Sequence, residues 1–134
     1  MPMRSDDGTL TGTALDEWQT HIISALKTTG RNLSDSVNWG SYMREAGSVD
    51  VVETRYYWGT NSWVKGRKQK LQAAWCQQNL LDGIGSMSMA LFTRVLGWST
   101  ERIEALLTGV RNDLRDRSVH AYAEVYVVYG RKPE

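Results

Sequence analysis

One long alternating segment near the C-terminus constrains the fold of this chain more than any other feature. From Val119 to Tyr129 successive residues fall alternately on two faces, which predicts a long β-strand that Gly130 ends. A second strand is predicted from Val49 to Trp58, where β-branched and aromatic residues are frequent. Two strands alone are marginal in water, and a long strand leaves unpaired backbone groups along any uncovered edge. We therefore expect another chain or a larger sheet to complete this one.

Helices are predicted for most of the remaining residues, because apolar side chains recur at spacings of three and four. Gly30 and Gly47 are placed to end the first two helices, and Ser99 to cap the last. Gly83 and Gly85 are interpreted as a helix–helix turn between the third and fourth helices. The five predicted helices begin at about Thr13, at Ser34 or Asp35, near Leu71, at Met87 and after Ser99.

The 134 residues suit one domain of the α+β class, mostly helical with one antiparallel pair of long strands. The expected organisation is an irregular entry segment (1–12), helices, strand and tryptophan loop (13–66), a lid-like helical insertion (67–117) and a C-terminal strand (118–134).

Composition excludes several classes of function. Hydrophobic residues make up 41% and charged residues 23% of the chain, and the formal net charge is +1, so neither disorder nor a basic nucleic-acid footprint is indicated. No apolar run approaches membrane-spanning length. The lone Cys76 cannot form an internal disulfide, and with His21 and His120 it makes no recognisable metal site. A cytoplasmic protein without metal, membrane or nucleic-acid partners is expected.

The chain contains six Trp and six Tyr but one Phe. Such aromatics suit a ligand pocket, and they suit a core or an interface equally well. The loop at residues 59–66 holds Trp63 between two glycines, as a mobile flap or as a turn pinned by one aromatic anchor.

Candidate site residues follow from these patterns. Histidine is the titratable residue type best matched to neutral pH, and His120 shares a strand face with the hydroxyl donor Tyr122, so these two are the candidate catalytic residues. A hydrogen-bonded sheet histidine is the alternative for His120. The candidate substrate-binding residues are Trp58, Trp63, Trp75, Met87 and Phe92.

Several separated segments resemble a known family in the order in which they occur. They are Asp6–Leu10, Tyr57–Trp63, Ala90–Trp98, Val119–Tyr122 and Tyr126–Pro133. Together they resemble the C-terminal part of LaeA-like fungal secondary-metabolism methyltransferases that depend on S-adenosylmethionine. The resemblance implies a class I methyltransferase fold, in which the last two strands of a doubly wound sheet pair antiparallel. The helices at 67–116 would then be an insertion over the substrate.

The resemblance also implies where the cofactor binds. In this family the cofactor lies on the first strand–glycine-rich loop–helix unit, with an acidic residue after the second strand, and both elements precede the part that this chain resembles. The segment Leu80–Ser86 contains Gly-x-Gly, but a helix rather than a strand comes before it, so no cofactor is expected to bind this chain alone. Gly59 and Val64 stand where the family has prolines, which loosens the tryptophan loop.

Three functions remain open. The first is a methyltransferase-derived protein without a donor site that binds a small apolar metabolite and steers its cyclisation or rearrangement, with His120 or Tyr122 polarising a carbonyl. The second is a non-catalytic subunit of a full-length methyltransferase, and the third is a truncated fragment of one. A homo-oligomer built through strand edges is expected, with a full-length methyltransferase as the alternative partner.

Overall fold

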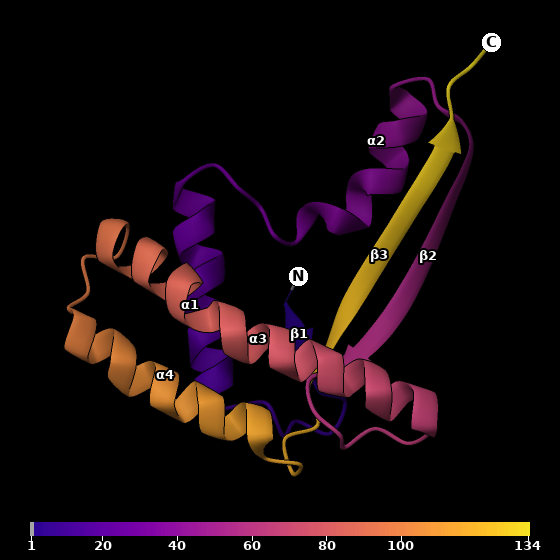
Figure 1. The fold of residues 1–134 in the computed structure, drawn as a ribbon. Coiled ribbons are helices and arrows are strands. Elements are labelled where there is room, and N and C mark those ends of the chain that lie inside the picture. The colour runs from indigo at the N-terminus through magenta and orange to yellow at the C-terminus, as the bar shows by residue number, and fades with distance from the viewer. Residues whose placement is uncertain (1) are drawn as a thin grey trace.

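A computed structural model describes residues 2–134 as a helical body from which a long two-stranded ribbon projects (Figure 1). The class is α+β, as the sequence predicts. The elements are β1 (Met3–Arg4), α1 (Ala14–Thr28), the 3-10 helix η1 (Asp35–Asn38), α2 (Trp39–Glu45), β2 (Val49–Gly59), α3 (Arg67–Arg94), α4 (Thr100–Arg115) and β3 (Tyr122–Arg131).

The predicted helix ends are confirmed for α1 and α4. The Thr13 side chain accepts a hydrogen bond from the backbone N–H of Asp16 at the start of α1, and Gly30 takes the left-handed conformation just beyond its end, with φ of +80°. The Ser99 side chain caps α4 by accepting from the N–H of Arg102. Local sequence therefore sets these boundaries.

The predicted turn at Gly83 and Gly85 is wrong. A single helix of 28 residues, α3, replaces the expected third and fourth helices and runs through both glycines. Glycine disfavours a helix by about 1 kcal/mol relative to alanine. Burial offsets this cost, because Ile84, Ser88 and Phe92 on one side of α3 are almost completely buried.

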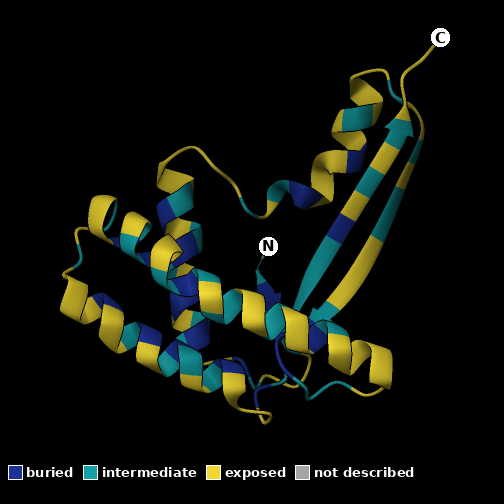
Figure 2. Ribbon diagram, in the orientation of Figure 1, coloured by how far each residue is buried: buried dark blue, intermediate teal, exposed yellow. Residues whose placement is uncertain are grey.

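The main core lies where α1, α3 and α4 pack together (Figure 2). One buried hydrogen bond crosses it, since the Trp18 indole N–H donates to the Ser88 hydroxyl at 2.7 Å. The insertion at 67–117 thus supplies two of the three core helices. The largest apolar side chains of this core are Leu15, Trp18, Ile22, Ile84, Phe92, Ile103, Leu107, Val110 and Leu114.

The sheet has three antiparallel strands in the order β1-β3-β2. The entry segment, expected to be irregular, contains β1, and Met3 pairs with Ala123. Strand β3 begins at Tyr122 rather than at Val119, so His120 precedes the strand. Beyond the two residues of β1, that edge of β3 has no strand partner among residues 2–134.

The two faces of the β2–β3 ribbon are covered at different places. Near the helical body, α3 packs against β2, whereas towards the far end α2 and η1 lie along the opposite face and Tyr126 is buried there (Figures 1 and 2). Residues paired across antiparallel strands share a face. The pairs Val52–Tyr129, Thr54–Val127 and Tyr56–Val125 therefore lie together, on the face that does not carry Tyr126.

Much of this second face is apolar and open to solvent. Val52, Tyr56, Val127 and Tyr129 are 40, 49, 43 and 59% exposed. We call these four residues the bare face. An exposed apolar surface of this kind is typical of an interaction site. No helix of the described chain is long and apolar enough to cross a membrane.

Candidate functional site

His120 and Asp7 form the centre of the candidate site. Asp7 lies in the loop after β1, and its carboxylate oxygen Oδ2 is 2.5 Å from Nδ1 of His120. Asp7 also accepts from the N–H and hydroxyl of Thr9, whose own hydroxyl accepts from the backbone N–H of His120 at 2.8 Å. The hydrogen bond from His120, followed by those from Thr9, lowers the pKa of Asp7 to about 2. With Nδ1 directed at a carboxylate, neutral His120 presents Nε2 as a proton acceptor.

Trp63 stacks beside this pair. Its ring centroid lies 5.1 Å from that of His120, and its indole N–H donates to the carbonyl of Ala121 at 2.9 Å. Its backbone N–H donates to the buried Asn61 side chain, whose amide in turn donates to the carbonyls of Asp116 and Val119. These contacts favour the pinned turn over the mobile flap.

Tyr122 extends the site towards the sheet. Its hydroxyl donates to Oδ1 of Asp6 at 2.8 Å, and its ring meets the ring of Tyr57 edge to face, with centroids 5.7 Å apart. The hydrogen bond to Asp6 is the largest cause that raises the pKa of Tyr122. A carboxylate and two aromatic rings thus converge at the start of β3.

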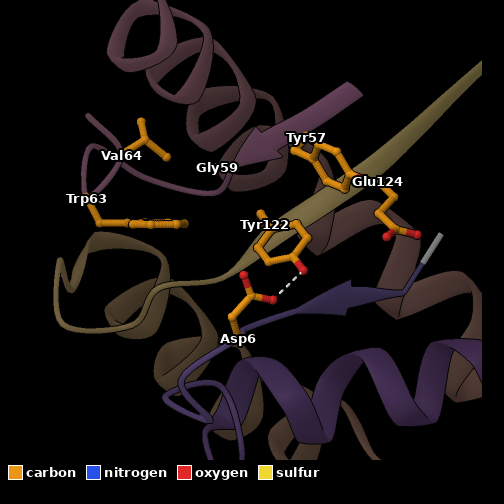
Figure 3. Close-up of a pocket in the computed structure, with 7 residues that line it drawn as sticks. All are labelled: Asp6, Tyr57, Gly59, Trp63, Val64, Tyr122 and Glu124. Atoms are coloured by element: carbon orange, nitrogen blue, oxygen red, sulfur yellow. Dashed lines mark hydrogen bonds between the residues drawn. The ribbon is translucent and has the colours of Figure 1, made fainter. Parts of the chain in front are cut away.

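These side chains line two adjacent pockets that share Asp6, Trp63 and Tyr122. The larger, of about 380 Å³, is shown in Figure 3, and the smaller, of about 120 Å³, contains Asp7 and His120. Neither lining includes a residue of α3 or α4. The larger pocket is lined by Asp6, Tyr57, Gly59, Trp63, Val64, Tyr122 and Glu124.

Gly59 lines the larger pocket at a position where there is no room for a side chain. A Cβ atom at this position would lie 2.5 Å from Cγ1 of Val64, so only glycine lets the Val64 side chain close over the end of β2. The two positions where the resemblance implies prolines are thus packed against each other.

A separate apolar cavity of about 530 Å³ lies between α1 and α3. Most of its lining side chains are apolar and come from these two helices, including Met87 and Cys76 of α3, and the polar side chains of Gln19 and Arg31 also reach it. Ala123 of β3 also lines it, and Ala123 shares a sheet face with the bare face. Apolar surface therefore continues from this cavity onto the ribbon.

The seven predicted site residues do not line one pocket. His120, Tyr122 and Trp63 come together, although His120 lies just before the strand rather than within it. Met87 lines the apolar cavity, and Trp75 is 70% exposed on α3. Phe92 is buried in the core against Trp98, and the buried indole nitrogen of Trp58 has no hydrogen-bond partner among the described residues. The roles predicted for these residues stay predictions.

Sequence reasoning did not select four residues that help to build this site: Asp6, Asp7, Tyr57 and Asn61. All four lie within segments that carry the family resemblance, Asp6–Leu10 and Tyr57–Trp63. The run Asp-Asp-Gly-Thr is also typical of a turn in which an Asp side chain bonds the backbone two residues on. That local signal predicts the turn, but not its contact with His120.

The Gly-x-Gly segment at Leu80–Ser86 lies within a helix and does not form a loop after a strand. Gly83 and Gly85 lie inside α3, where backbone N–H groups are directed along the helix, and no strand precedes them. Within residues 2–134, no group of three His, Cys, Asp or Glu side chains could hold a metal ion.

Comparison with known proteins identifies the relatives of this chain. It is 38% identical over 133 residues to the "Probable methyltransferase tdiE" of Emericella nidulans, covering 98% of this chain and 42% of that protein. It is 30% identical over 132 residues to the "Methyltransferase pytC" of Aspergillus terreus, covering 98% of this chain and 41% of the relative. The "Secondary metabolism regulator laeA" of Aspergillus fumigatus is 28% identical over 131 residues, or 97% of this chain and 35% of the relative.

No protein-family model matches the chain. No solved structure matches it. The chain spans about two fifths of the length of the tdiE and pytC relatives. Over nearly its whole length, this chain is a homologue of the C-terminal part of fungal methyltransferases and LaeA secondary-metabolism regulators.

Proposed function

We propose that this chain is the substrate-side, C-terminal module of a methyltransferase and acts together with a part that binds S-adenosylmethionine. That part is a preceding segment of the same polypeptide or a second chain. The relatives support the reading, since their similarity to this chain covers only about two fifths of their length. The observation that carries the proposal is the bare face of the ribbon.

The bare face suits a packed partner better than solvent. Four apolar or aromatic side chains, Val52, Tyr56, Val127 and Tyr129, lie on one side of two long strands and remain 40 to 59% exposed in the described part of the chain. The same face continues through Ala123 into the apolar cavity between α1 and α3. The edge of β3 beyond β1 is also free to pair with a longer strand. Helices of a cofactor-binding part would bury this surface.

Reconstitution tests the proposal. The chain is mixed with the purified N-terminal part of its relative tdiE from Emericella nidulans. Analytical ultracentrifugation measures association, and calorimetry measures binding of S-adenosylmethionine. We expect a heterodimer that binds the cofactor. Val127→Lys places a charge on the bare face and is expected to weaken association by at least about tenfold. Val37→Lys, at an exposed apolar position of η1, is the matched control.

Two results would contradict this proposal. One is a chain that stays a stable monomer and never associates with the cofactor-binding part. The other is a stable homodimer whose formation Val127→Lys abolishes, which would support the expected homo-oligomer instead. Equal effects of Val127→Lys and Val37→Lys would show that the bare face is not the contact surface.

A second candidate function is the cofactor-independent cyclisation or rearrangement of a small apolar metabolite. The apolar cavity supports it, because about 530 Å³ lies within the usual size of small-molecule sites. Its test uses the chain alone, with polyketide or terpenoid precursors and product analysis by mass spectrometry. Turnover without any partner protein would favour this function, and Met87→Trp, which fills the cavity, would abolish that turnover.

A further inference from the structure

The pocket of about 380 Å³ between the tryptophan loop and the start of β3 combines negative charge with aromatic walls (Figure 3). We call it the acidic aromatic pocket. We propose that it binds a ligand whose protonated amine is attached to an aromatic body. The pocket has two carboxylates and three aromatic rings in its lining and no basic side chain.

Charge comes from two carboxylates on different elements. Asp6 follows β1, Glu124 lies on β3, and both line the pocket. Arg4 approaches Glu124 at 3.7 Å from an exposed position, so solvent screens this pair. Asp6 makes no ion pair within residues 2–134, and its observed side-chain partner is the hydroxyl of Tyr122. A carboxylate keeps further acceptor sites after one hydrogen bond, which leaves Asp6 able to receive an ammonium group.

The aromatic walls of the pocket also favour a cationic ligand. The rings of Tyr57 and Tyr122 meet at 75°, so they bound the pocket from two directions, and Trp63 bounds it from the loop (Figure 3). The faces of aromatic rings carry partial negative charge and attract cations, most strongly on Trp and Tyr. Trp63 is held in place by hydrogen bonds to Ala121 and Asn61, so little ordering is needed when a ligand enters.

The lining disfavours other ligand classes. It contains no Lys or Arg, so an anionic ligand would meet only like charge. The described residues offer no cluster of metal ligands, which argues against a bare divalent cation. The pocket volume is at the small end of the range of ligand sites and suits a single aromatic ring with a short side chain.

This inference does not require the proposed function, because every lining residue belongs to this chain. Where the proposed function holds, the pocket is the place for the amine-bearing part of the methyl acceptor. Binding is measured on the chain alone, with no cofactor-binding part present. Failure of the reconstitution and failure of ligand binding can therefore be told apart.

Three probes with a similar body and different charge test the inference by isothermal titration calorimetry at neutral pH. They are 2-phenylethylamine, which is protonated, neutral 2-phenylethanol, and anionic 3-phenylpropionate. We expect the amine to bind, the alcohol to bind at least about tenfold more weakly, and the carboxylate not to bind. Equal binding of amine and alcohol, or no binding of the amine up to millimolar concentration, would overturn the inference.

Variants identify the site. Asp6→Asn keeps an acceptor for the Tyr122 hydroxyl while removing the charge, and it is expected to raise the dissociation constant of the amine by about tenfold. Asp50→Asn, which neutralises an exposed carboxylate at the far end of the ribbon, is the matched control and leaves the constant unchanged. Circular dichroism confirms that both variants are folded. An unchanged constant in Asp6→Asn, or the same loss in both variants, would place the binding elsewhere.

Discussion

Nδ1 of His120 lies 2.5 Å from Oδ2 of Asp7, although 113 positions separate the two residues in the sequence. This contact joins the loop after β1 to the residue that leads into β3. Both side chains line the smaller pocket, and the contact directs Nδ1 of His120 at the carboxylate.

The Asp7 carboxyl is expected to titrate at a pH of about 2, because hydrogen bonds from His120 and Thr9 favour its charged form. A pKa lowered by folding stabilises the protein above the ordinary value of 3.8, and this contribution disappears as the pH falls from 3.8 to about 2. The free energy of unfolding should therefore fall more steeply over this range in the unmodified chain than in Asp7→Asn. Carbon-13 NMR titration of the carboxyl and urea unfolding measure the two effects. A midpoint of Asp7 close to 3.8 would contradict the contact.

Removing the charge of Asp6 should lower the pKa of Tyr122. The hydrogen bond to the Asp6 carboxylate is the main reason that the pKa of this phenol lies above its ordinary value of 10.0. In Asp6→Asn the phenol should ionise at lower pH, as followed by ultraviolet absorbance in alkaline solution. Tyr122→Phe identifies which transition belongs to this residue. If the titration of Asp6→Asn overlays that of the unmodified chain, the two side chains do not interact in solution.

Asn61→Ala is expected to destabilise the chain by about 2 to 3 kcal/mol, because it removes three hydrogen bonds between a buried side chain and the backbone. The buried side chain donates to the carbonyls of Asp116 and Val119 and accepts from the N–H of Trp63. Urea unfolding measures the loss, and acrylamide quenching should show a more accessible Trp63. Asn79→Ala, at an exposed position of α3, should change stability by less than about 0.5 kcal/mol. Similar losses in both variants would argue against the anchoring role.

Gly83→Ala should stabilise the chain by about 1 kcal/mol, since Gly83 lies inside α3 and an added Cβ meets no atom within 4 Å. Gly109→Ala, in α4, is the contrasting variant. Its Cβ would lie 2.7 Å from Cβ of Ala14, so the gain in helix propensity is outweighed by overpacking of about 1 to 3 kcal/mol. Thermal unfolding followed by circular dichroism compares the two. A destabilised Gly83→Ala would restore the interpretation of this segment as a turn.

Local signals in the sequence were sufficient for several elements. Interactions among residues close in the chain predict the start of α1 near Thr13, the Gly30 stop, the Ser99 cap and two long strands. The structure confirms each of them, except that β3 begins at Tyr122 and not at Val119. The sequence also predicted the family relationship, because several short segments resemble those of the family in the same order.

Tertiary structure decided the features that depend on distant partners. Propensity favours a break at Gly83 and Gly85, yet α3 is continuous because its buried side packs into the core formed with α1 and α4. Strand β1 exists only because β3 offers it a hydrogen-bonding edge. The sequence likewise marked His120, Tyr122 and Trp63, whereas Asp6 and Asp7 join them only when the N-terminal segment meets the start of β3. Hydrogen bonds and burial between remote segments have no local periodicity, so only the folded chain displays them.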